Sequence, residues 1–526
     1  MSLDILKSLK DWQKTILTHP WFRGGILAII LAVFGGLFAI IGLKLLEPSS
    51  LSKLLPGEPT AAYVEFDLTQ YANAMSKSSP QFPFDFSKIQ DFLSLTQKNT
   101  TKTLPSWVKN KAGIAWLQTN SQDLQKVIFL ENDPKKTPPL TDFPSSSSAM
   151  VQKINKYLVF SSSKEVFQIL NDVQNGITPN LKHSADFIKL RPNLPYDSMT
   201  FGYLKTAKLN HLLQIDSLKT NPFFSLATDI ELGLRPYFPA LGFALNPYEK
   251  GLSLQTYWVG DKNKFKNQAL FDLNKKYNGS LLSYLPQKTN LVIGGEDFSS
   301  LLSQIKALLE TNDSGKGSML TALLQSWFEN YWGNIGEAEK MLAPLFSNEY
   351  LLGLIPFPTE TNTKIPVSYD SGFLLGLTIN SEEEKIANNL LDILLNRGII
   401  KIDQEQSSIG KIALEKITRL NSKIPYDVIQ LKTGKILFQI MIYKNMLFFS
   451  LDEKIMQQVA DLLTNNEENY TTSESFQELK NIMSSANFVV DFSNQDVLQS
   501  QYGLNQIISS FNLFDDGGNS LHLLEF

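Results

Sequence analysis

Two short segments carry the residue types of a serine acyl-enzyme. Ser161-x-x-Lys164 places a hydroxyl and a lysine at the spacing of penicillin-binding-type enzymes, and Lys432-Thr433-Gly434 supplies a second motif of that class. No Ser-x-Asn stands between them. The serines also precede a helix-like segment, and the lysine–threonine–glycine suits a hairpin turn, so structural roles are the stronger interpretation for both.

Phosphate chemistry is also poorly supported. The segment "DSGKGSM", 313–319, contains a glycine–lysine pair, but Glu310 stands where a phosphate loop needs glycine. Gly317 follows the lysine, where serine or threonine would be needed to reach a phosphate-bound magnesium ion. A surface loop explains the segment better.

Metal ligands are scattered. The four histidines are far apart in sequence, at His19, His183, His211 and His522, and the chain has no cysteine. This excludes disulfides, thiolate metal sites and a cysteine nucleophile. The "FDDGGN" segment, 514–519, could offer oxygen ligands to calcium, but a hairpin turn accounts for it. We therefore expect no catalytic residue, no cofactor and no metal, and the sequence favours a protein that is not an enzyme.

Composition bounds the architecture and the partners. The chain has 526 residues, of which 43% are hydrophobic and 19% charged, so it can form two or three packed cores. The formal net charge of -4 argues against nucleic acid, which requires a basic surface. The absence of disulfides fits a bacterial envelope better than animal secretion.

An uncharged apolar segment, 24–43, has the length of a single transmembrane helix. It is longer than the apolar part of a cleaved signal peptide, so we expect an uncleaved signal anchor. Lysine and arginine gather before it, at Lys7, Lys10, Lys14 and Arg23. This favours a cytoplasmic N-terminal segment, 1–23, a linker, 44–54, and export of the rest. The location would be a cell membrane or an internal, thylakoid-type membrane of a bacterium.

Small residues recur every four positions within that segment, at Gly24, Ala28, Ala32 and Gly36. This spacing puts them on one face of a helix, where a second helix could approach closely. They are our candidate transmembrane contact face.

A repeated pattern organises the exported part. Leu-Pro followed by a short apolar run occurs at Leu55, Leu194 and Leu285, and each run leads to a helix-capping residue. A weaker copy, "ANFVVDFSNQDVLQ", lacks the Leu-Pro. We predict repeat units at 55–180, 190–281 and 282–465 and a partial unit at 480–526. The fold class expected is α+β: a transmembrane helix, then duplicated units of mostly antiparallel sheet with packed helices.

A second repeat aligns 154–165 with 442–453 without a gap. Each copy is an apolar strand that runs into Ser-x-x-Glu, at Ser162 with Glu165 and at Ser450 with Glu453. This spacing is typical of a capping box, in which the serine and the glutamate satisfy backbone N–H groups at a helix start. We predict that a helix follows each box, and that Thr433-Gly434 and Lys444-Asn445 form hairpin turns.

One aromatic segment stands out within the third unit. In the inserted stretch 318–332, Trp327 and Tyr331 share one apolar face at helical spacing, and Phe328 and Trp332 widen it. Most stripes of this kind are core, but the polar segment 311–318 and the glycines after it suit an exposed helix. We predict that these four residues form an interaction surface on the outside of the body.

The chain resembles a family of exported bacterial proteins with one N-terminal anchor, catalogued as domain-of-unknown-function family 3352. The resemblance lies in the anchor, in Leu55-Pro56 with "AAYVEFD", in the strand 107–117 with Gly113, and in "KYLVFSSSKEVFQIL". It implies an envelope or internal-membrane location and supplies no reaction and no catalytic residues.

These observations favour a non-enzymatic scaffold or accessory factor that is anchored in the membrane by one helix and presents its exported body to protein partners. The alternative is an exported binder or carrier of a lipophilic small molecule, since sheets backed by helices can enclose an apolar pocket and the chain has 34 phenylalanines.

Overall fold

The computed structural model describes residues 51–77, 107–120, 123–136, 150–211, 238–260, 276–297, 344–345, 347–357, 371–397, 399–403, 408–412, 414–420, 424–465, 468–483, 486–493, 498, 504–514 and 517–525. The chain divides into two units, Met1–Lys53 and Leu54–Phe526. The described part of the first is the 3-10 turn η1 (Leu51–Lys53). The second unit contains the fold described below.

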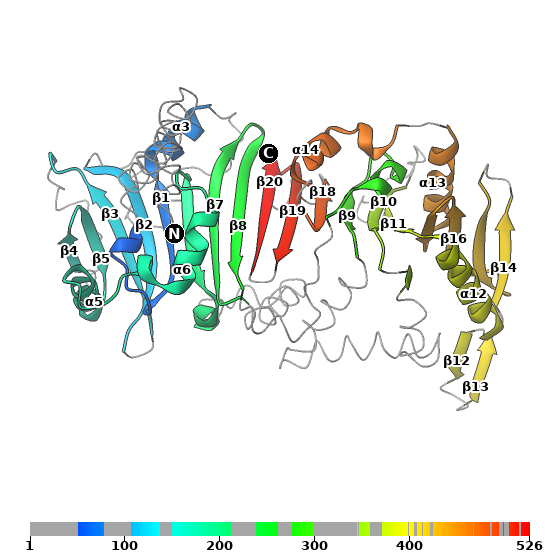
Figure 1. Cartoon of the computed structure of the whole chain (residues 1–526), viewed down its shortest axis with the longest axis horizontal. Helices are drawn as coiled ribbons and strands as arrows, with labels where there is room; N and C mark the ends of the chain where they lie inside the picture. Colours follow the sequence, from blue (N-terminus) through cyan, green and yellow to red (C-terminus); the bar gives the residue numbers. More distant parts are fainter. Residues whose placement is uncertain are drawn as a thin grey trace, which may run out of the picture. The chain divides into compact units, whose positions relative to one another are not determined.

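One antiparallel sheet of 18 strands dominates the second unit (Figure 1). Its spatial order is β4-β5-β3-β2-β1-β6-β7-β8-β20-β19-β18-β9-β10-β11-β17-β16-β15-β14. The strands are β1 (Thr60–Asp67), β2 (Val108–Gln118), β3 (Leu124–Asn132), β4 (Met150–Ile154), β5 (Tyr157–Ser161), β6 (Thr200–Lys205), β7 (Ala240–Tyr248), β8 (Gly251–Val259), β9 (Leu291–Gly295), β10 (Tyr350–Pro356), β11 (Ser371–Thr378), β14 (Leu414–Arg419), β15 (Tyr426–Leu431), β16 (Ile436–Tyr443), β17 (Met446–Ser450), β18 (Phe488–Phe492), β19 (Gln506–Phe514) and β20 (Gly517–Glu525). A separate hairpin joins β12 (Ile399–Asp403) to β13 (Ser408–Ile412).

The predicted fold class is therefore wrong. We expected an α+β chain of separate units with packed helices after a transmembrane helix, but the strands form one continuous ladder with few helices. The error has a physical reason: a strand that closes a small sheet and a strand that continues a large one have the same apolar pattern. The predicted unit boundaries stay predictions.

No helix in the described ranges is long and apolar enough to cross a membrane, so the predicted transmembrane helix gains no support there. The segment predicted to be that helix, 24–43, lies outside the described residues, as do Gly24, Ala28, Ala32 and Gly36.

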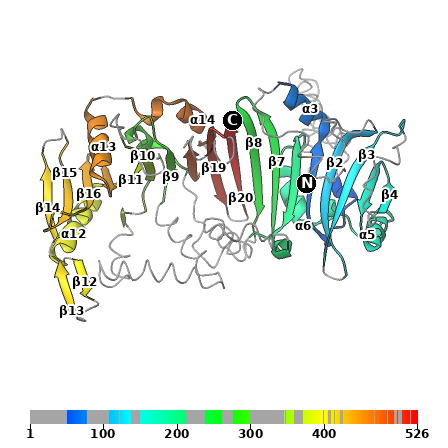
Figure 2. The same cartoon turned by 180° about the vertical axis from the view of Figure 1, so that it is seen from behind.

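The described helices are α3 (Leu68–Lys77), α5 (Lys164–Gln174), α6 (Ala185–Leu190), α12 (Ser381–Arg397), α13 (Glu453–Asn465) and α14 (Glu474–Met483), several of which are visible from behind in Figure 2. They form because apolar residues recur at helical spacing: α5 buries Val166, Phe167, Leu170 and Val173 against the sheet. The predicted helices after both repeated strands are confirmed as α5 and α13.

The two halves of the ladder are built alike. The segment from the turn before β5 to the end of α6 has the same order of elements as the segment from the turn before β17 to α14. Asn155 and Lys444 both have left-handed φ angles, 54° and 53°. Ser184 and Ser473 both accept a hydrogen bond from the backbone N–H of a phenylalanine three residues later. The bridges Pro56–Asn180 and Pro286–Asn469 also correspond. One half is thus a structural duplicate of the other.

This match differs by one residue from the alignment expected from sequence, and the two capping boxes are wrong. Ser163 caps α5 without a side-chain bond, and Glu165 instead accepts from the backbone N–H of Asn120 at 2.7 Å. Ser450 accepts from the N–H of Asp452, outside the helix. A reciprocal box does form at α12, where Asn380 Oδ1 accepts from the Glu383 N–H and Glu383 Oε2 accepts from the Asn380 N–H.

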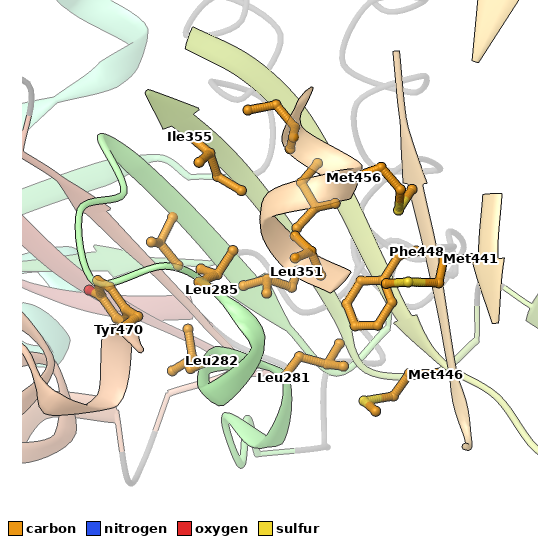
Figure 3. Packing of buried hydrophobic residues seen from close by; sticks show 14 of the residues in the cluster. Leu281, Leu282, Leu285, Leu351, Ile355, Met441, Met446, Phe448, Met456 and Tyr470 are labelled. Carbon is orange, nitrogen blue, oxygen red and sulfur yellow. The ribbon is translucent and has the colours of Figure 1, made fainter. Parts of the chain in front are cut away.

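A large cluster of buried side chains lies in the second half, where α13 and α14 pack on the sheet. Figure 3 shows Leu281, Leu282, Leu285, Leu351 and Phe448 gathered below a helical segment, with the buried Met441, Met446 and Met456 on the same side of the cluster as Phe448. Phe448 is 0% exposed. In the first half, one buried cluster includes Trp107, and the buried rings of Tyr63, Phe187, Phe201 and Tyr203 form a further group. The sheet therefore has a core in each half, and the junction between them lies at β8 and β20.

Candidate functional site

The junction between the halves, which we call the seam, is formed by β8 and β20. Nine residue pairs join the two strands, from Gly251–Glu525 to Val259–Gly517. When the strand pairings are followed from the matched turns to the seam, Thr256 on β8 is structurally equivalent to His522 on β20. By the same offset Gln255 is equivalent to Leu521, and these two residues pair with each other at the centre of the seam. Because equivalent strands meet antiparallel about this pair, the seam is a local pseudo-twofold axis.

A line of polar side chains crosses one face of the seam. Thr256 Oγ1 lies 2.7 Å from Ser520 Oγ, and Ser520 Oγ lies 2.7 Å from His522 Nε2. His522 Nδ1 lies 2.8 Å from Ser509 Oγ on β19. These four side chains share a face because Thr256 pairs with Ser520 and Ser509 pairs with His522. They form one hydrogen-bonded chain across three strands.

The imidazole of His522 in this hydrogen-bonded line is neutral. Burial lowers the pKa of His522 to about 4, so near neutral pH one ring nitrogen donates and the other accepts. The ring of Phe511 meets it edge-on, with centroids 5.3 Å apart. Both serine neighbours are 4% exposed. A serine beside a neutral imidazole is one part of a nucleophilic site, but both ring nitrogens here contact hydroxyls and not a carboxylate. This arrangement holds strands together better than it activates a nucleophile.

The opposite face of the seam carries charges. Lys250 Nζ lies 2.5 Å from Glu474 and 2.9 Å from Glu478, both on α14, and 3.9 Å from Glu525. The hydrogen bond from Lys250 lowers the pKa of Glu474, whereas burial raises the pKa of Glu478 and of Glu525. Tyr248 donates to Glu478. The cluster attaches a helix of the second half to the end of β7–β8 in the first.

One carboxyl group is fully enclosed beside the seam. Asp491 on β18 is 1% exposed; it accepts from the Tyr470 hydroxyl and, at 2.6 Å, from Gln506 Nε2. Burial raises its pKa from 3.8 to about 6 despite these two donors. No sequence pattern indicates this site, because Asp491 stands within an apolar strand and its partners lie on other elements.

The seam hydroxyls give a direct prediction. Ser520→Ala would leave Thr256 Oγ1 and His522 Nε2 without their shared partner, and we expect it to lower the free energy of unfolding by about 1–3 kcal/mol. Ser253→Ala on β8 is the matched control, since that hydroxyl makes only a 3.5 Å contact with the Asn246 carbonyl. Urea unfolding of the two variants checks this. Equal losses would show that the polar line contributes nothing specific.

The residues singled out from sequence fall in several places. Trp327, Phe328, Tyr331 and Trp332 lie outside the described residues, so their surface stays a prediction. Ser161 and Lys164 lie at the junction of β5 and α5, and Lys432–Gly434 forms the turn between β15 and β16, with Gly434 at φ 84°. The two hairpin predictions are confirmed. Within the described ranges no group of three acidic or histidine side chains could hold a metal ion.

Together these features define a protein with two similar half-sheets joined edge to edge. A family model described as "Protein of unknown function (DUF3352)" matches residues 134–412, more than half of the chain. The chain therefore belongs to the DUF3352 family.

Other comparisons add little. No curated protein matches the chain. A solved structure titled "Structure of crystal form I of TP0453" matches with 13% identity, covering 40% of this chain and 79% of that chain, at a TM-score of 0.22. Likeness at this level establishes neither fold nor function.

Proposed function

We propose that the protein is a non-enzymatic scaffold or accessory factor, exported and held at a bacterial membrane, that presents its sheet to protein partners. The observation that carries the proposal is that the strand at each end of the sheet pairs with another described strand on one side only. β4 and β14 are the terminal strands, and no second strand in the described ranges pairs with either. A terminal strand has backbone N–H and C=O groups directed outward, which a partner's extended segment can bind.

The side chains at these ends are accessible. Val151 in the middle of β4 is 41% exposed, and Leu420, directly after β14, is 76% exposed. The membrane location is supported by the excess of lysine and arginine before the apolar segment 24–43, which favours a cytoplasmic N-terminus with the bulk exported.

Crosslinking in native membranes tests the proposal. A photo-reactive amino acid at Val151 or at Lys416 should give discrete protein adducts in membrane fractions, since both positions lie on terminal strands. The same group at Ile177, which is 71% exposed but lies after α5, is the control. Purification in a mild detergent should recover the same partners.

Two outcomes would count against the proposal. Recovery of the bare protein without adducts under several conditions would remove the partner role. Enrichment of one lipid or pigment in organic extracts of the purified chain would favour the alternative, a carrier of a lipophilic molecule.

A further inference from the structure

The duplicated halves show what the end of the first half lacks. β4 is the counterpart of β16: each forms a hairpin with the next strand, β5 or β17, through a turn with a left-handed residue. The same bond follows each turn, from Asn132 N–H to the Lys156 carbonyl and from Ile379 N–H to the Asn445 carbonyl, both at 2.8 Å. Matching along these hairpins places Val151 where the second half has Ile440.

The outer edges of the two counterparts differ. β16 is covered by β15, with Asp427 opposite Ile440 and Val428 opposite Gln439. β15 belongs to the stretch between β11 and β16, which in the first half is replaced by residues 133–149 between β3 and β4. That connection contains Pro134, Pro138, Pro139 and Pro144. Proline has no N–H to give to a ladder, so the composition does not favour an in-chain counterpart of β15.

We propose that the outer edge of β4 accepts an extended, acidic-apolar segment of a partner protein as an antiparallel strand, in the place that β15 takes beside β16. This inference rests on the proposed function and names the edge and the chemistry of the partner. Backbone hydrogen bonds supply the affinity, and the side chains of β4 set the preference.

The charge on β4 selects the occupant. Val151 and Lys153 are both exposed and share a face of the sheet. A strand in the register of β15 would put its residue at the Asp427 position opposite Val151 and diagonal to Lys153, within reach of the ammonium group. A second copy of β4 centred on Gln152 would instead bring two lysines into diagonal positions. A carboxylate-bearing partner segment is therefore favoured over self-pairing.

Hydrogen exchange on the purified full chain tests the inference. The probe is a capped synthetic peptide copying residues 424–432, which contains β15. We expect the backbone amides within Met150–Ile154 that point away from β5 to gain protection with increasing peptide, while those of the chain's own β15 and β16 remain unchanged. Protection at β14 alone, or no protection at β4, would overturn the inference.

A charge exchange makes the test specific. Lys153→Glu should weaken binding of the peptide by about two- to fivefold, and a peptide carrying Asp427→Lys should recover it on that variant. Lys153 is exposed and makes no ion pair within the described part of the chain, so thermal unfolding should show that the fold is retained. Binding that is indifferent to both exchanges would remove the acidic preference and overturn the proposal as stated.

The outcomes also separate this inference from the proposed function. If the peptide fails to protect β4 but protein adducts form in native membranes, β4 is not the binding edge, while the proposed scaffold role stands. Protection of β4 that grows with protein concentration and needs no peptide would show that a second copy covers this edge, which contradicts the proposal.

Discussion

Asp491→Asn is expected to make the free energy of unfolding rise more steeply with pH between about 4 and 6.5 than it does in the unmodified chain. The carboxyl of Asp491 has its pKa raised to about 6 in the folded chain, so folding favours its protonated form. Its stabilising contribution is present below the unfolded pKa of 3.8 and is lost as pH rises through about 6. The full loss is about 3 kcal/mol for a shift of this size in a group that is 1% exposed.

His522 works in the opposite direction over the same range. Its pKa falls from 6.5 to about 4 on burial, so folding favours the neutral ring. That contribution is present above pH 6.5 and is lost as pH falls toward 4. In the unmodified chain the two groups offset each other. An asparagine at position 491 keeps an oxygen that can accept from Gln506 but has no group that titrates in this range. The pH dependence of stability that comes from His522 then becomes visible.

Unfolding by urea at pH 4.5, 5.5 and 6.5 measures this, with pH values chosen inside the window that the two pKa values define. His522→Gln is the complementary variant: its free energy of unfolding should fall as pH rises. If Asp491→Asn and the unmodified chain have parallel pH profiles, Asp491 is not the buried acid described above.

Gly242→Ala is expected to lower the free energy of unfolding by about 1–3 kcal/mol through overpacking. A Cβ at this position in β7 would lie 2.2 Å from Cδ2 of Leu190 on α6. Leu190 is 0% exposed, so the surrounding atoms leave it little room to shift. The second half has Ile508 at the equivalent place, in the same buried cluster as Leu479, the counterpart of Leu190. A larger side chain is therefore accommodated at this place in the second half.

A double-variant cycle distinguishes overpacking from a general effect of alanine in a strand. Leu190→Ala alone should cost about 2–5 kcal/mol by leaving a cavity. Combined with Gly242→Ala it should cost at least 1 kcal/mol less than the sum, because the new methyl group occupies part of that cavity. Purely additive losses would show that the contact with Leu190 does not limit this position.

Local patterns predicted local structure well. The helices after the repeated strands and the two hairpin turns depend on residues close in sequence, such as Val166 with Leu170 or Thr433 with Gly434, and the structure confirms them. Even there, the structural alignment of the two repeated segments differs by one residue from the alignment based on the Ser-x-x-Glu spacing. Ser450 accepts from a backbone N–H outside the helix, so this spacing alone did not identify the residue that caps the helix.

Long-range pairing could not be predicted in this way. Nothing in the alternation of β8 distinguishes β20 as its neighbour, although Thr256 and Ser520 are 264 residues apart and in contact. For the same reason Asp491 gave no signal: its partners Tyr470 and Gln506 lie on an adjacent turn and strand. The fold class was predicted wrongly for this reason, because it depends on which strands pair in space and not on where the strands lie in the sequence.

Covalent connection changes what the seam must accomplish. Two separate half-length chains that met along β8 and β20 would have to overcome the full entropic penalty of association, which favours large apolar interfaces. Within one polypeptide the second half is held near the first at an effective concentration on the order of millimolar or more, so a modest interface stays closed. The seam can then tolerate hydroxyls, an imidazole and a lysine among carboxylates, residue types that a freely dissociating dimer of the same size would have to exchange for apolar ones.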